Sequence, residues 1–236
     1  MNFHSRRITS LALILFSFGA ACSESRGQAS SKPIAYGLVI DNTDRESLDN
    51  EIDCGTLLVN GNGPADETFV VRFTNSDNIS IVQDFTAQKA TLADALGNMF
   101  VESGSPAVLD AIYLAAQHFA GQEKVSQFAQ GRRALVLIAH GADIGSFYRI
   151  DDVLSLLRET DVRVYVTGVS ADGEARTFLD GLAKRSGGRA YFPASMVAAE
   201  KVAREILSAI GKQQRRKFGG PSSENLGDTI LNRPVA

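Results

Sequence analysis

Runs of apolar residues, each about the length of one β-strand, recur along this chain and are separated by segments with helical periodicity. The four longest runs are Ile34–Ile40, Thr68–Phe73, Ala134–Ala139 and Val162–Gly168. An uninterrupted apolar run of this length is typical of a strand that is buried on both faces of a sheet. Alternation of such strands with helices predicts a mostly parallel central sheet with helices on both faces, a Rossmann-like α/β fold.

The segments around these runs predict the remaining elements of the domain. Apolar residues at intervals of three and four predict helices around Leu109–Phe119 and Val153–Leu157. Ile79–Phe85 follows the second run across a short Asn-Ser-Asp-Asn turn, so we expect it to pair antiparallel with that strand at the edge of the sheet. A short strand at Ala190–Phe192 and a helix from Ser195 to Lys217 complete the expected domain.

The first 21 residues have the layout of a secretory signal peptide. Arg6 and Arg7 precede the apolar run Leu11–Phe18, and Gly-Ala-Ala follows it. The uncharged stretch is shorter than the roughly 20 residues that a membrane-spanning helix needs. We therefore expect four segments: a signal peptide at 1–21, a polar tether at 22–33, a folded domain at 34–217 and a flexible C-terminal tail at 218–236.

Cys22 directly follows these small residues, which is similar to the lipoprotein cleavage box of bacteria, in which the cysteine becomes lipidated. The alternative is plain cleavage after Ala21. If Cys22 is lipidated, Cys54 has no cysteine to pair with and is expected to be a buried, inert thiol. If Cys22 keeps its thiol, a disulfide between Cys22 and Cys54 is an alternative that the spacing does not decide. In both cases we expect an exported protein, located in the bacterial periplasm or cell envelope or secreted, with membrane attachment through a lipidated Cys22 as one form.

Charge and motifs exclude several function classes. The chain has 24 Lys and Arg against 27 Asp and Glu, a net charge of −3, whereas nucleic-acid-binding domains carry a basic excess. No GxGxxG follows the first run and no GxxxxGK[ST] occurs. The segment Gly168–Asp172 lacks the second glycine of the GxSxG nucleophile elbow. Nucleic acid, dinucleotides and nucleoside triphosphates therefore have no support as partners.

Polar segments follow three of the expected elements. Asp41–Arg45 follows the first strand, Gly104–Ile112 precedes and enters a helix, and His140–Asp143 follows the strand at Ala134–Ala139. In an open parallel sheet, ligand sites form outside the carboxyl ends of the strands. We therefore expect these three segments to meet at one crevice.

In this order, the segments resemble the motifs of the von Willebrand factor type A (VWA) domain, and particularly of a secreted bacterial subgroup. In that subgroup an apolar strand ends in DxSxS, a loop like GGTALYDAI follows, a later strand ends in TDGED, and an LAxxTGGxxY-like segment comes last. The matching segments are Leu38–Asp41, Gly104–Ile112, Ala134–Asp143 and Leu182–Phe192, and the resemblance covers about residues 34–217. It implies a domain that binds another protein rather than a catalyst.

VWA domains of the usual kind bind Mg²⁺ at a metal-ion-dependent adhesion site (MIDAS). In this chain, several residues that correspond to MIDAS ligands are of types that do not bind Mg²⁺. The first Asp and first Ser of DxSxS correspond to Asp41 and Thr43, which both offer oxygen, but the second Ser corresponds to Arg45. The loop threonine falls on Pro106, and the Asp of TDG falls on His140. Because Mg²⁺ requires hard oxygen ligands in octahedral geometry, we expect a degenerate MIDAS without tight Mg²⁺ binding.

Two alternatives remain for this crevice. In the first, Asp41, Thr43 and His140 form a site for another divalent cation, because imidazole suits Zn²⁺ better than Mg²⁺. In the second, Arg45 takes the place of the metal and pairs with Asp41. Ser105, next to Pro106, is the residue that would replace the missing threonine hydroxyl.

The residues and the resemblance together predict an exported, non-enzymatic adhesion or scaffold module that binds a protein partner and needs no cofactor, with Mg²⁺ or another divalent cation as the alternative. The competing function is a metal-dependent hydrolase or phosphotransferase of the haloacid dehalogenase type that uses Asp41, although Thr43 replaces the second carboxylate of that family's DxD motif. Asp110 is expected to brace the crevice loops. The expected crevice residues are Asp41, Thr43, Arg45, Ser105, His140 and Asp143.

Overall fold

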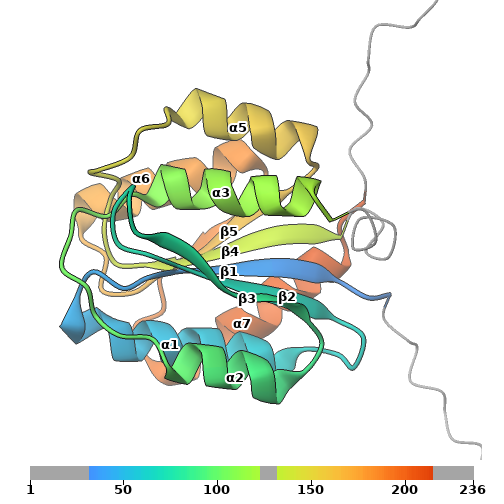
Figure 1. The fold of residues 1–236 in the computed structure, drawn as a ribbon. Helices are drawn as coiled ribbons and strands as arrows, with labels where there is room; N and C mark the ends of the chain where they lie inside the picture. Colours follow the sequence, from blue (N-terminus) through green and yellow to red (C-terminus); the bar gives the residue numbers. More distant parts are fainter. Residues whose placement is uncertain (1–31, 123–131, 215–236) are drawn as a thin grey trace, which may run out of the picture. The chain divides into compact units, whose positions relative to one another are not determined.

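A six-stranded sheet covered by helices on both faces forms the core of the protein (Figure 1). The computed structural model describes residues 32–122 and 132–214. The strand order is β3-β2-β1-β4-β5-β6, and only β3 runs antiparallel to its neighbour. The expected α/β fold, mostly parallel with one antiparallel edge strand, is thus confirmed. The predicted signal peptide, Cys22 and the predicted C-terminal tail lie outside the described residues.

The strands coincide with the apolar runs to within one or two residues. β1 is buried along its whole length, as its uninterrupted apolar sequence predicts. β3 is largely accessible to solvent, which fits its position at the edge of the sheet. The strands are β1 (Ala35–Asp41), β2 (Glu67–Phe73), β3 (Ile79–Thr86), β4 (Arg133–Ala139), β5 (Arg163–Gly168) and β6 (Ala190–Tyr191).

The helices form two layers, one on each face of the sheet. α1, α2 and α7 cover one face, and α3, α5 and α6 cover the other (Figure 1). Asp44, Asp172 and Ser195 cap α1, α6 and α7, because each side chain accepts a hydrogen bond from a backbone N–H of the first turn. The helices are α1 (Arg45–Gly61), α2 (Lys89–Gly97), α3 (Val108–Ala120), α5 (Ile150–Glu159), α6 (Gly173–Ser186) and α7 (Met196–Gly211).

The end predicted for the last helix is wrong, because α7 stops at Gly211 rather than at Lys217. Beyond Gly211 the chain leaves the helix axis, and the buried Gln213 donates a hydrogen bond from Nε2 to the Tyr165 hydroxyl at 3.2 Å. This tertiary contact ends a helix that periodicity alone would continue. The basic residues beyond 214 lie outside the described part of the chain.

Two apolar layers hold the helices to the sheet. Alternate residues of β1 and β4 face opposite layers: Val39 and Leu137 pack against α3, α5 and α6, whereas Leu38 and Val136 pack against α1, α2 and α7. Gly187 ends α6 with a left-handed backbone (φ 85°), as a glycine at this position commonly does. This position lies in the LAxxTGGxxY-like segment, so that segment has a structural role here.

The site is positioned by the two central strands. β1 and β4 are parallel neighbours, with Ile40 opposite Ile138, so both end at the same edge of the sheet. The connection from β1 leads to β2 on one side, whereas β4 continues to β5 on the other, so the carboxyl ends of the two strands form a topological switch point, where ligand sites of such sheets lie. We call this point the crevice. Among the described residues, no helix is long and apolar enough to cross a membrane.

Candidate functional site

Asp41, the last residue of β1, lies at the floor of the crevice with no solvent exposure. Its Oδ1 accepts hydrogen bonds from the backbone N–H and the hydroxyl of Thr43, at 3.0 and 2.6 Å. This tight turn orients the carboxylate, so that Oδ2 points away from Thr43. Burial raises the pKa of Asp41, although His140 and the Thr43 hydrogen bonds oppose the shift.

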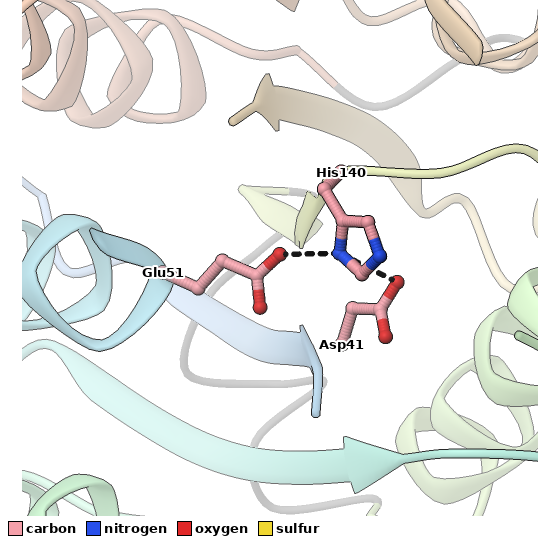
Figure 2. Close-up of side chains that lie close together, drawn as sticks. All are labelled: Asp41, Glu51 and His140. Carbon is pink, nitrogen blue, oxygen red and sulfur yellow. Dashed lines mark hydrogen bonds and ion pairs between the residues drawn. The ribbon is translucent and has the colours of Figure 1, made fainter. Parts of the chain in front are cut away.

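His140, the residue that follows β4, faces Asp41 across the crevice. Its Nδ1 lies 3.4 Å from Asp41 Oδ2 and 3.1 Å from Glu51 Oε1, and its Nε2 lies 3.5 Å from the Thr43 hydroxyl. Figure 2 shows the imidazole between the two carboxylates, with all three side chains pointing toward one another. The imidazole therefore connects two acids that come from different elements.

Asp41, His140 and Glu51 on α1 form a trio of neighbouring side chains, and Glu51 is the member that the sequence did not predict. Its side chain is completely buried, and Leu48, Cys54 and Leu58 on the same helix are also buried. These spacings of three, three and four residues place Glu51 in the middle of an apolar stripe. Ionisable residues are rarely buried in such a stripe without a partner. An acid at this position would therefore have indicated a buried site if the helix had been predicted from the sequence.

The trio is incompletely satisfied. Asp41 Oδ2 and Glu51 Oε2 are buried and accept no hydrogen bond, although Asp41 Oδ2 is within ion-pair distance of His140. Burial raises the pKa of Glu51 to about 8 against the opposing effect of its bond to His140, and that same bond raises the pKa of His140. Glu51 and His140 thus retain protons to a higher pH than they would in water.

Three other predicted site residues lie elsewhere or are engaged in local structure. Arg45 is the first residue of α1 and its side chain is exposed, so the alternative in which it pairs with Asp41 is not found. Ser105 is exposed and lies against Gly145, without a hydrogen bond to Asp41, Thr43 or His140 in the described chain. Asp143 accepts hydrogen bonds from the Leu109 backbone and from the Ser146 hydroxyl, which explains it as a brace for the start of α3.

Two buried polar residues hold the loops around the crevice. Asp110 accepts hydrogen bonds from the backbone N–H groups of Phe147 and Tyr148, at 2.9 and 2.8 Å, and from the Ser76 hydroxyl. This matches its expected bracing role. Asn42 donates from Nδ2 to the Phe100 carbonyl at 2.9 Å and accepts from the Thr74 hydroxyl. The loops are therefore fixed by side chains beneath them.

Exposed apolar side chains gather at this same end of the sheet. Phe147 and Ile144, in the segment after β4, are 84% and 72% exposed, and Phe100 stands beside Asn42 on the loop before α3. Met196 and Val197 are exposed in the first turn of α7. Large exposed apolar residues grouped around a polar crevice are typical of a protein-interaction surface. We call Phe100, Ile144 and Phe147 the apolar rim.

Solved structures with this architecture identify the fold. No family model matches the sequence, and no curated protein matches it. An aerotolerance-related membrane protein from Bacteroides fragilis superposes with a TM-score of 0.58 and 16% identity, over 75% of this chain and 99% of that one. A von Willebrand factor type A structure from Catenulispora acidiphila gives 0.60 and 14%, over 76% and 43%. The chain has a VWA fold.

A further VWA-fold neighbour contains a metal in its MIDAS. Proximal thread matrix protein 1 from the mussel byssus, with a zinc-occupied MIDAS motif, superposes with a TM-score of 0.61 and 18% identity, over 77% of this chain and 46% of that one. At these identities the likeness shows the fold alone. The occupant of the crevice in this chain must therefore be argued from its own side chains.

The side chains in this VWA-like fold provide only part of the ligand set that Mg²⁺ prefers. The ion requires about six oxygen ligands at 2.0–2.1 Å. The crevice offers the Asp41 and Glu51 carboxylates and the Thr43 hydroxyl, but the next position is a nitrogen of His140, Arg45 is exposed, and Pro106 has no donor atom in its side chain. The described donors are therefore a mixed set of oxygen and nitrogen.

Proposed function

We propose that this VWA domain is an exported, non-enzymatic module that binds a protein partner at the crevice end of its sheet without the Mg²⁺ of a MIDAS. The observation that carries the proposal is the apolar rim: Phe147, Ile144 and Phe100 are exposed on loops that surround the Asp41–His140 crevice. Aromatic residues on well-braced loops supply contact area at little cost in conformational entropy. The rim therefore suits a partner with its own apolar patch.

The burial of Asp41 supports a binding role rather than catalysis. A hydrolase or phosphotransferase that uses an aspartate as nucleophile must bring its oxygen to the substrate. Asp41 has no exposure, and one of its oxygens is held by Thr43. The neighbours are described as a membrane protein, a VWA structure and a thread matrix protein. We expect no turnover of a generic aryl phosphate, with Asp41→Asn as the matched control.

Export remains part of the proposal through residues 1–33. The basic and apolar layout of residues 1–21 supports cleavage before Cys22, and residues 22–33 are polar enough to serve as a tether to the envelope. The membrane description of the Bacteroides fragilis neighbour is compatible with such a location. Fractionation of cells that express the wild type or Cys22→Ser tests this: a lipid anchor predicts that only the variant is released from the membrane fraction.

Partner capture tests the binding role directly. The full chain is immobilised and exposed to an envelope extract of its host, in the presence of a chelator, alongside Phe147→Asp and the control Val82→Asp, which alters an exposed apolar residue on β3. We expect the wild type and Val82→Asp to capture the same protein in equal amount, and Phe147→Asp to capture at least about tenfold less of it. Equal capture by all three would contradict docking on the rim.

A further inference from the structure

The buried trio beneath the crevice forms a ligand set of its own. The geometry points to a Zn²⁺ site composed of Asp41, Glu51 and His140, with chemistry different from that of a Mg²⁺-binding MIDAS. One ligand atom from each of the three side chains lies within 4.8 Å of the other two. In the described ranges 32–122 and 132–214, no other trio of His, Cys, Asp and Glu side chains meets this condition.

The separations between the ligand atoms suit a tetrahedral ion. Ligands at about 2.0–2.1 Å from Zn²⁺ lie roughly 3.3–3.4 Å from one another when the geometry is tetrahedral. His140 Nδ1 lies 3.1 Å from Glu51 Oε1 and 3.4 Å from Asp41 Oδ2. Figure 2 shows His140 joined to each of the two carboxylates, and ligand atoms of Asp41 and Glu51 also lie within 4.8 Å of each other. The ion can therefore enter with only small movements of side chains that are already in place.

Two unsatisfied oxygens provide an independent reason to expect a ligand. Asp41 Oδ2 and Glu51 Oε2 belong to fully buried side chains and accept no hydrogen bond. A buried carboxylate oxygen without a hydrogen bond carries a desolvation cost that a bound cation lowers. With neutral His140, one Zn²⁺ and two carboxylates sum to zero charge, which suits a site closed off from water on the side of α1.

The imidazole of His140 and its contact with Thr43 determine which ion the site prefers. Imidazole nitrogen with two carboxylates is a set that Zn²⁺ accepts and that Mg²⁺ disfavours. Thr43 contacts both sides of the site: its hydroxyl donates to Asp41 Oδ1 and lies 3.5 Å from His140 Nε2. A proton on Nε2 directed at Thr43 leaves Nδ1 free for the metal, so Thr43 is a positioning residue. The side chain of His140 is 22% exposed, so the site is accessible to solvent on the side of His140.

Calorimetric titration tests the site with Zn²⁺ and Mg²⁺ as the probes. The full chain, carrying no histidine tag and stripped with a chelator, is compared with Glu51→Gln, His140→Ala and Thr43→Val. His118→Gln is the matched control, because His118 also lies 2.8 Å from a carboxylate, that of Asp84, but outside the trio. Glu51→Gln is nearly isosteric, so its fold is expected to survive, and the thermal unfolding of each variant is measured in parallel.

We expect the wild type and His118→Gln to bind one Zn²⁺ per chain. Binding should weaken more than about 100-fold in Glu51→Gln and His140→Ala, and about 10–100-fold in Thr43→Val. Zn²⁺ should raise the unfolding temperature of the wild type and leave that of Glu51→Gln unchanged. Absence of saturable Zn²⁺ binding by the wild type, or equal binding by Glu51→Gln, would overturn the inference. The inference concerns the buried trio alone and does not depend on a partner at the rim.

Discussion

His140 and Glu51 are joined by a hydrogen bond of 3.1 Å although 89 residues separate them along the chain. The bond links the residue after β4 to the second turn of α1. It also holds Nδ1 of His140 3.4 Å from the carboxylate of Asp41, the last residue of β1. In the resemblance to VWA domains the position of His140 corresponds to an aspartate, so a base stands here where the resemblance places an acid.

Removal of the imidazole should destabilise the fold. His140→Ala leaves the buried carboxylates of Asp41 and Glu51 facing each other without a base, and breaking a buried pair in this way costs about 3–5 kcal/mol. The free energy of unfolding is measured by urea denaturation in the presence of a chelator. Arg185→Ala is the control, since it breaks an exposed pair with Asp151 and should cost less than about 1 kcal/mol. Equal losses in the two variants would show that burial of the trio is unimportant.

Replacement of Glu51 by its amide should be tolerated in the absence of metal. Glu51→Gln keeps a hydrogen-bonding group beside His140 and removes a buried acid, so we expect the free energy of unfolding to stay within about 1 kcal/mol of the wild type or to rise. Glu51→Ala removes the bond to His140 altogether and should cost more. Denaturation of both variants in chelator makes the comparison. A glutamine variant as unstable as the alanine variant would argue that the negative charge itself is required.

The start of α1 should depend on acid pH through Asp44. The Asp44 carboxylate accepts a hydrogen bond from the Ser47 backbone N–H at 2.9 Å, and the contact with Ser47 lowers the pKa of Asp44 below its usual 3.8. A lowered pKa in the folded state means that this contribution is complete above about pH 4 and is lost as the pH falls through the folded value. Asp44→Ala should cost about 0.5–2 kcal/mol at neutral pH, and the difference from the wild type should shrink below pH 4. A constant difference across this range would contradict the assignment.

The thiol of Cys54 should be unreactive in the folded protein. Burial raises its pKa to about 11, so little thiolate is present at neutral pH, and within the described residues Cys54 forms no disulfide. In a Cys22→Ser chain, in which Cys54 is the remaining cysteine, an aromatic disulfide reagent should label the thiol in urea but only slowly under native conditions. Rapid native labelling would place Cys54 at an open surface.

The sheet was predictable because its strands are buried on both faces and therefore appear as uninterrupted apolar runs. Leu38 and Val39, for example, face opposite layers and are both apolar, so the run marks the strand without revealing its register. The site was only partly predictable. Asp41 ends β1, Thr43 lies two residues beyond it and His140 directly follows β4, and the side chains of these three residues lie together.

Glu51 and Arg45 show where the sequence was insufficient. Asp44 caps α1 and Arg45 is the first residue of that helix, with an exposed side chain, so Arg45 does not contact Asp41. The same helix carries Glu51 into the buried layer, where it contacts His140; the alternative in which Arg45 pairs with Asp41 named no partner on this part of α1. Packing against the sheet sets the orientation of α1 and thereby decides which of its side chains face the site. Motifs at strand ends do not specify that orientation.

The proposed function depends on a crevice that does not bind Mg²⁺ tightly. Calorimetric titration of the chelator-treated full chain with Mg²⁺, with Asp41→Ala in parallel, tests this directly. We expect no saturable Mg²⁺ binding by either protein, because His140, Arg45 and Pro106 supply no oxygen ligands from their side chains at the positions where a MIDAS requires them. Low-micromolar Mg²⁺ binding that Asp41→Ala abolishes would contradict it.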